Sequence, residues 1–240
     1  NGTQARPAVE PHSMRLTFIG TSHRDPGGYV RLRAALERHA PEIVLVEVSP
    51  ASLALRYTLG VICRALISLR IRRMGLALNA ELRSMIEYFR PAYEYLAARD
   101  YCRAHGCALR LVDVSVLSIM RFFPSMGMVR ARALARSARI EADRFHGERL
   151  SAQRIFLGGD ELLTGLRLLQ FEDGTVAFRE RVLARRVRKA LRRSPDARIA
   201  YVGGWEHCMD DPEGRTLYAA LKGADLSNCA VERDILIASK

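Results

Sequence analysis

Residues 42–48 read EIVLVEV, a nearly continuous apolar and β-branched run that Pro50 ends. Such a run predicts a strand covered by protein on both faces, which is the usual situation in a parallel sheet. Further runs of strand-like character lie at residues 15–20 (RLTFIG), 108–114 (ALRLVDV), 198–203 (RIAYVG) and 230–238. Together they predict one central, mostly parallel sheet.

Helical patterns separate these strands. They lie before His39, at 52–74, at 79–104 with a break at Pro91, and at 213–222, with a long helical insertion at about 116–195. Repeated strand–helix alternation predicts an α/β fold, a three-layer α/β/α sandwich around the sheet. We expect one domain at 14–240. Residues 1–13 are polar and directly precede Met14, so we interpret them as an expression remnant outside the fold.

The composition is that of a folding globular chain with a strong positive charge. Of 240 residues, 49% are hydrophobic and 27% charged, and the formal net charge is +12. All basic residues except Lys189, Lys222 and Lys240 are arginine and are spread along the chain, which a GC-rich coding sequence also produces. The densest run, Arg179 to Arg193, is expected to form a solvated helix face, and a nucleic-acid partner is not expected.

The cysteines and the apolar stretches indicate the cellular compartment and the possible contact with a membrane. The five cysteines form no C-x-x-C pair and their odd number prevents complete pairing, so we expect a reducing, cytoplasmic compartment. Arginines interrupt the apolar stretch 52–74, which argues against a membrane-spanning helix. A buried or surface-lying helix is expected there, and a peripheral membrane contact stays open.

Candidate chemistry lies just after the predicted strands, where ligands bind in parallel sheets. His23 and His207 each follow a glycine, Gly20 or Gly204, in the frame G-x-x-H. Glycine permits a sharp turn, and imidazole can bind a metal or move a proton. Glu47 lies inside an apolar strand, where a carboxylate is costly unless it is paired, protonated or metal-bound. A pairing of Glu47 with an arginine such as Arg56 is the structural alternative.

Further elements follow in a fixed order along the chain. They are Gly20-Thr21-Ser22-His23, Pro41-Glu42 before the strand with Glu47, Arg56, Glu81-Leu82-Arg83, the strand-ending Asp113, Glu180-Arg181, and Gly204-Trp205-Glu206-His207. In this order the motifs resemble those of the TraB/TIKI/GumN superfamily, which is related at fold level to ChaN-like and erythromycin-esterase-like proteins. The chain departs from much of that family at Trp205-Glu206, where a small residue usually precedes the second histidine.

The resemblance implies a site in which His23, Glu47 and His207 converge, and some members of the superfamily are described as manganese- or cobalt-dependent proteases. Two imidazoles and a carboxylate can hold a divalent ion with an open water position, and we expect manganese or cobalt rather than zinc. Glu206, Arg56 and Arg181 are further catalytic candidates. Gly20, Arg83, Asp113 and Gly204 are candidates for substrate binding.

We therefore expect a metal-dependent hydrolase that acts on peptide or amide bonds. The alternative is a non-enzymatic protein that binds a peptide or small ligand in the same cleft, because a ligand shell and a catalytic shell need the same residue types. The sequence leaves the oligomeric state open, a homodimer included.

Overall fold

The computed structural model describes residues 14–23, 25–139, 144–222 and 229–236. Residues 1–13, interpreted above as a remnant, lie outside this range. The described chain contains a five-stranded sheet in the order β3-β2-β4-β1-β5, with every neighbouring pair parallel. The strands are β1 (Met14–Thr21), β2 (Ile43–Val46), β3 (Ala108–Leu111), β4 (Arg198–Gly204) and β5 (Cys229–Ile235).

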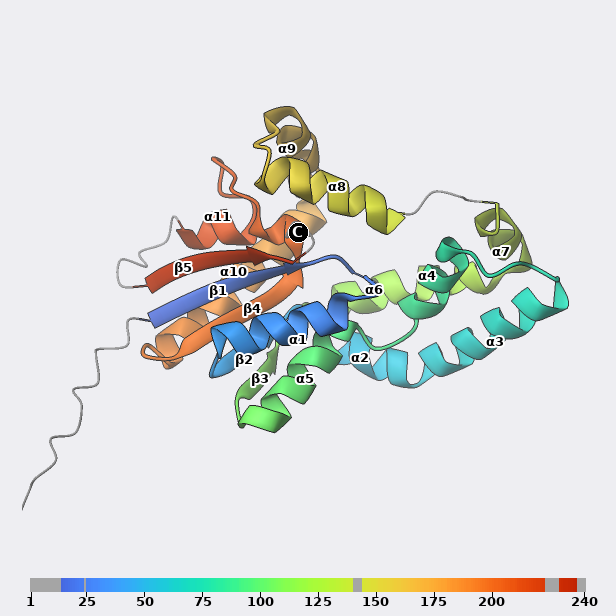
Figure 1. Cartoon of the computed structure of the whole chain (residues 1–240), viewed down its shortest axis with the longest axis horizontal. Coiled ribbons are helices and arrows are strands. Elements are labelled where there is room, and N and C mark those ends of the chain that lie inside the picture. The colour runs from blue at the N-terminus through green and yellow to red at the C-terminus, as the bar shows by residue number, and fades with distance from the viewer. Residues whose placement is uncertain (1–13, 24, 140–143, 223–228, 237–240) are drawn as a thin grey trace, which may run out of the picture.

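Helices cover both faces of this sheet (Figure 1). On one face, α1 (Gly28–His39) and α5 (Tyr93–His105) pack against a cluster that includes Val44 and Val202. On the other face, α10 (Gly174–Arg193) and α11 (Leu217–Lys222) pack against Leu45 and Tyr201. Successive strand residues point to opposite faces, and both faces are buried. This confirms the predicted α/β/α sandwich, with a sheet that is parallel throughout its described strands.

The remaining helices fall into two groups. Between β2 and α5 lie α2 (Pro50–Tyr57), α3 (Leu59–Arg73) and α4 (Ala80–Tyr88). Between β3 and α10 lie α6 (Ser115–Ser125), α7 (Ala131–Ser137), α8 (Arg144–Phe156) and α9 (Glu161–Leu168), with the 3-10 helices η1 (Met126–Val129) and η2 (Leu169–Glu172). The 3-10 helix η3 (Trp205–Cys208) follows β4 directly.

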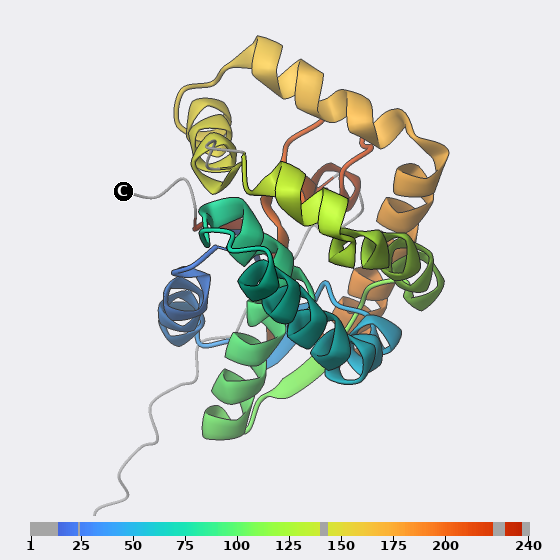
Figure 2. The same cartoon turned by 90° about the vertical axis from the view of Figure 1, so that its right-hand side faces the viewer.

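We call α3, α4, α6, η1 and α7 the helical lobe. They enclose a hydrophobic cluster of their own, which includes Ile67 from α3, Leu82 from α4, Phe122 from α6 and Leu134 from α7. The lobe lies at one end of the molecule, beyond the carboxyl ends of the strands, and faces the viewer in Figure 2. It therefore borders the edge at which the predicted site residues lie.

Several boundaries differ from the sequence-based expectation. The helix expected at 213–222 begins only at Leu217, and residues 237 and 238 of the last expected strand lie outside the described residues. The stretch 52–74 is not one helix but α2 and α3, bent by 47° at Thr58. At the bend, Gly60 lies so close to the backbone carbonyl of Phe89 that a side chain would not fit. This contact packs the start of α3 against the end of α4. The strand expected at 108–114 is shorter, because β3 is the partly exposed edge of the sheet.

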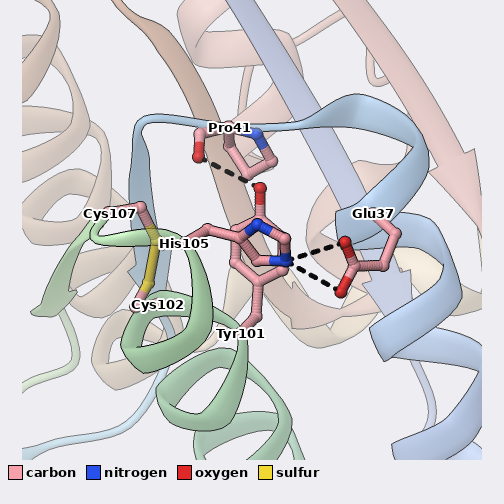
Figure 3. The surroundings of a disulfide bond; sticks show 6 residues. All are labelled: Glu37, Pro41, Tyr101, Cys102, His105 and Cys107. Carbon is pink, nitrogen blue, oxygen red and sulfur yellow. Dashed lines mark hydrogen bonds and ion pairs between the residues drawn. A yellow bond between two sulfur atoms is a disulfide. The ribbon is translucent and has the colours of Figure 1, made fainter.

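Cys102 and Cys107 form a disulfide, a pairing that the cysteine spacing did not predict (Figure 3). Helix α5 ends at Gly106, whose φ of 71° turns the chain back and brings the two Cα atoms to 4.5 Å. Beside it, His105 Nε2 lies 2.9 Å from Glu37 Oε2, which ties this turn to α1. Cys63 and Cys208 are buried thiols and Cys229 is a half-buried one.

Candidate functional site

The order of the strands brings the predicted residues together. Strand β4 lies between β2 and β1, and its Gly203 and Gly204 are opposite Gly20 and Thr21 of β1. Because all three strands are parallel, their carboxyl ends meet at one edge of the sheet. His23 follows β1, Glu47 follows β2 and His207 follows β4, so all three side chains belong to this edge.

Glu47 is a buried carboxylate with several partners. Its side chain is 1% exposed, and its Oε2 accepts hydrogen bonds from the Tyr201 hydroxyl (3.0 Å) and the Gly204 N–H (2.9 Å). Its Oε1 lies 2.5 Å from Arg179 Nη2 and 2.9 Å from His207 Nε2. Burial alone would raise the pKa of Glu47, but the positive charges of His207 and Arg179 hold it well below its usual range. Glu47 is therefore ionised.

The pairing of Glu47 with an arginine, considered from sequence as the structural alternative, is thus present, with Arg179 and not Arg56 as the partner. Arg56 donates to the backbone carbonyls of Tyr88 and Arg90 (2.8 Å for Arg90). Arg179 also donates from Nε to Asp113 Oδ1 at 2.7 Å, and it is largely buried, with 14% of its side chain exposed. The start of the arginine-rich run is therefore part of the site and not a solvated face.

His207 is held between two buried carboxylates. Its Nε2 faces Glu47, and its Nδ1 lies 2.7 Å from Glu180 Oε1. The second oxygen of Glu180 accepts from the Leu217 N–H at 2.8 Å, which fixes that carboxylate in place. Burial would lower the pKa of His207, but the charges of Glu47 and Glu180 raise it to about 10. Without a bound cation, His207 is therefore an imidazolium at neutral pH.

His23 has the same kind of support but is open to solvent. Its Nδ1 lies 2.8 Å from Oε1 of the buried Glu94, while 58% of its own side chain is exposed. The protein around the ring displaces water and lowers the pKa of His23, but the hydrogen bond and charge of Glu94 outweigh this and raise it. With Nδ1 engaged, Nε2 is the ring atom left for a ligand or a proton.

Both imidazoles lie near Gly204. A Cβ atom placed on Gly204 would lie 3.6 Å from His23 Nε2 and 3.7 Å from His207 Nε2. Both nitrogens therefore border the small volume that the missing side chain leaves open. At Gly203, a Cβ atom would overlap the Glu47 carboxylate, so a glycine is required there as well.

Two cavities open on either side of this point. The first cavity, of about 240 Å³, is lined by residues that include Glu47, Arg56, Tyr93, Asp113 and Phe122. The second cavity, of about 230 Å³, is lined by residues that include Ser22, Phe171, Gly204, Glu206 and His207. His23 and Arg179 line both cavities. A ligand that contacts His23 and Arg179 can therefore extend into either cavity.

No protein-family model, curated protein or solved structure matches this chain. The resemblance to the TraB/TIKI/GumN superfamily rests on the order of the motifs and stays a prediction.

The other predicted site residues differ in where they lie. Glu206 lies at the second cavity, where its Oε1 is 3.1 Å from Arg167 Nη1. Arg83 and Arg181 are exposed on α4 and α10 and line neither cavity. Gly20 also lines neither, and its lack of a side chain serves packing, because a Cβ atom would lie 2.6 Å from Ile235 Cδ1.

Four residues of the site were not proposed as site residues from sequence, namely Glu94, Arg179, Glu180 and Tyr201, although Glu180 was quoted in the Glu180-Arg181 element. A signal for the two glutamates was present. Glu94 lies on the buried side of α5 with Ala97, Ala98 and Tyr101, and Glu180 lies on that of α10 with Leu183, Ala184 and Val187. A carboxylate at a core position of a helix is costly unless it is paired or metal-bound, as argued above for Glu47. It therefore indicates an ion pair or a functional site. No comparable signal separates Arg179 from the arginines that follow it.

The donor set at this edge fits a divalent cation in two respects. Metal-bound histidines usually donate their second N–H to a carboxylate, and Glu94 and Glu180 lie in that position toward His23 and His207. Glu47 Oε1 is buried without an aligned hydrogen-bond donor among the described residues, as are His207 Nδ1 and Glu180 Oε1 without an aligned partner, although all three atoms are within ion-pair distance of a charged neighbour. His23 Nε2, His207 Nε2 and Glu47 Oε1 are the atoms that would hold the ion. Within the described chain they do not form a ready-made group of three ligands.

Proposed function

We propose that the protein is a hydrolase of peptide or amide bonds that works with a divalent cation held by His23, Glu47 and His207. Manganese or cobalt suits this mixed nitrogen and oxygen donor set, and the superfamily resemblance favours them over zinc. The observation that carries the proposal is that both Nε2 atoms lie 3.6–3.7 Å from the position of a Cβ atom on Gly204, with Glu47 beside His207 and with His23 lining both cavities. When bound, such an ion lowers the pKa of a water molecule and polarises a substrate carbonyl.

Neighbouring residues fix the orientation of the side chains that would carry out this chemistry. Glu94 and Glu180 hold Nδ1 of His23 and His207, and so direct both Nε2 atoms toward Gly204. Gly203 makes room for the Glu47 carboxylate, and Gly204 leaves a small volume beside both Nε2 atoms. Fixed geometry of this kind contributes to catalysis because little reorganisation is needed when the reaction occurs.

Arg179 is the residue placed to bind negative charge that develops on the substrate. It lines both cavities, and Glu47 and Asp113 hold it by Nη2 and Nε. A guanidinium fixed in this way can donate its remaining N–H groups to an oxyanion. Glu206 lines the second cavity and accepts a hydrogen bond from Arg167, so it can contact the part of the substrate that extends beyond the reacting bond.

The test combines metal analysis with cleavage of a peptide library. Protein purified without chelator is expected to carry a divalent ion, and manganese or cobalt is expected to raise the rate of cleavage. His23→Ala should lower that rate by at least about 100-fold. His105→Ala is the matched control, because His105 is also paired with a carboxylate, Glu37, but lies by the α5 turn.

Two results would contradict the proposal. Equal loss of activity in His23→Ala and His105→Ala would mean that the effect is not local to the site. Binding of library peptides in the absence of any cleavage with manganese, cobalt or zinc would favour the non-enzymatic binding protein. That alternative uses the same two cavities and needs no bond to break.

A further inference from the structure

Helices α2 and α3 present an apolar side to the outside of the molecule. Large apolar side chains of these helices are 41–57% exposed, namely Tyr57 of α2 and Val61, Ile62, Leu66 and Leu69 of α3. The opposite side of α3, which includes Cys63, Ile67 and Ile71, is buried in the cluster of the helical lobe. Helix α3 is therefore apolar on both sides, whereas a surface helix of a globular protein is normally polar on its outer side.

We call this outer side the α3 face. Most charged residues of the surrounding segments are basic, although α4 carries Glu81 and Glu87. Residues 48–80, which contain α2 and α3, include five arginines and no Asp or Glu. Residues 114–140, which contain α6, η1 and α7, also include five arginines and no Asp or Glu. Arg72 and Arg73 are exposed at the end of α3, directly after the apolar side chains. The helical lobe thus combines exposed apolar area with a concentration of positive charge.

We propose that the α3 face docks on an anionic lipid bilayer, with α3 lying in the plane of the headgroups. Interfacial helices insert an apolar side to the acyl boundary and hold anionic lipids with basic residues, and both requirements are met here. A second copy of this chain would bring a like-charged lobe against the first, which disfavours a contact between copies. The inference goes beyond the proposed hydrolase activity and does not depend on it.

The packing of α3 favours lying on the membrane over crossing it. Among the described residues no single helix is long and apolar enough to span a bilayer, and α2 and α3 reach that composition only together, across their 47° bend. Insertion as a span would also remove Ile67 and Ile71 from the core of the lobe, whereas docking leaves that core intact.

Vesicle flotation tests the proposal. The wild-type protein is expected to float with phosphatidylcholine vesicles that contain phosphatidylglycerol and much less with phosphatidylcholine alone. Ile62→Glu/Leu66→Glu places two charges on the α3 face and should lower the partition coefficient by at least about tenfold. Arg72→Glu/Arg73→Glu should lower it as well, because the attraction to anionic lipid is electrostatic.

The matched control is Leu162→Glu/Leu166→Glu on α9. These leucines have the same spacing as Ile62 and Leu66, and they are more exposed, at 78% and 58%. This variant should float like wild type, and circular dichroism and thermal melts establish that all variants are folded. Unchanged flotation of Ile62→Glu/Leu66→Glu, or equal flotation with neutral and anionic vesicles, would refute the proposal. So would a wild-type dimer, seen by light scattering without vesicles, that Ile62→Glu/Leu66→Glu dissociates.

Discussion

Glu47 connects most of the charged residues at the candidate site. It accepts from Tyr201 and Gly204 with one oxygen and meets Arg179 and His207 with the other. Beyond these partners the network continues to Asp113 through Arg179 and to Glu180 through His207. A buried network of this kind loses more when one member is removed than a pairwise description implies, because the charge left behind has no water to solvate it.

Removal of the Glu47 charge should therefore be costly, and the cost should depend on Arg179. Glu47→Gln is expected to lower the free energy of unfolding by about 3–5 kcal/mol, as is usual when a buried ion pair is broken. In a double-mutant cycle followed by urea denaturation, Glu47→Gln and Arg179→Gln should couple by more than about 1 kcal/mol. Arg181→Gln, on the exposed side of the same helix, should not couple with Glu47→Gln. Equal coupling in both cycles would show that Arg179 is not the partner.

Gly203 should not tolerate a side chain. In Gly203→Ala the new methyl group would overlap the Glu47 carboxylate and lie 2.7 Å from the Tyr201 hydroxyl, so the network must shift. We expect a loss of about 1–3 kcal/mol in the free energy of unfolding, measured by urea denaturation. Gly165→Ala in α9 has no atom within 4 Å of the new Cβ and should be neutral or stabilising, since alanine favours helix. A tolerated Gly203→Ala would mean that the carboxylate is not fixed here.

At the scale of single residues, the sequence predicts part of this site. The two G-x-x-H elements and Glu47 could be identified because each is an unusual residue at a strand end. Arg179 could not, because its position in the site depends on how α10 rotates against the sheet. That rotation is set by packing of Leu183, Val187 and Leu191, and adjacent arginines in the sequence end on different sides of the helix.

The turn between α5 and β3 is an element held by a covalent link. The Cys102–Cys107 disulfide closes a short loop, so its removal should lower the free energy of unfolding by about 2 kcal/mol, mainly by freeing the unfolded chain. Thermal melts with and without dithiothreitol measure this. Cys102→Ser/Cys107→Ser should match the reduced wild type and should not respond to dithiothreitol. A response of that double variant would assign the effect to another cysteine.

The turn before α11 should make stability depend on pH. Asp211 accepts hydrogen bonds from the Arg215 N–H (2.7 Å) and Nε (3.0 Å). Burial would raise the pKa of Asp211, but these bonds lower it below the usual value of about 3.9. The stabilisation is thus present above that value and is lost as pH falls through the lowered pKa. The gap in urea midpoint between wild type and Asp211→Asn should be constant from neutral to mildly acidic pH and should shrink below about pH 4. A gap that grows with acid would reverse this sign.

Element boundaries show where sequence patterns are informative. The pattern places β1, α1, β4 and the break before α5 close to their observed positions, since each has a local signal in a glycine, a proline or an apolar run. It does not place the bend between α2 and α3, because residues 52–74 are compatible with one helix. The bend goes together with the close contact between Gly60 and Phe89, about thirty residues away, and such a tertiary contact has no local signal.

At the scale of the whole molecule, the hydrophobic core consists of clusters of unequal size. Large clusters cover both faces of the sheet, whereas the helical lobe has a smaller cluster that no strand enters. Regions with few buried apolar contacts open locally at lower free energy than the global transition. In hydrogen exchange, the amides of α3 and α7 should exchange faster than those of β4. Equal protection would mean that lobe and sheet unfold as one unit.

The α/β/α architecture itself was predictable, because alternation of buried strands and amphipathic helices is visible over the whole chain. The helical lobe was only partly predictable from the sequence. The insertion at about 116–195 was recognised as helical, but its association with α3 and α4 joins segments that are distant in sequence. Burial of Phe122 against Phe89, with ring centroids 5.8 Å apart, is a contact of that kind.

Under the proposed hydrolase activity, the position of His23 and Arg179 at both cavities would limit which bonds are cut. A bond held at these residues would have part of the substrate in each cavity, so we expect an endopeptidase-like preference for internal bonds and indifference to blocked termini. Each product fragment would occupy one cavity and would still contact His23 and Arg179, which the incoming substrate also has to contact. Both fragments should therefore act as competitive product inhibitors, and together they should compete more strongly than either does alone.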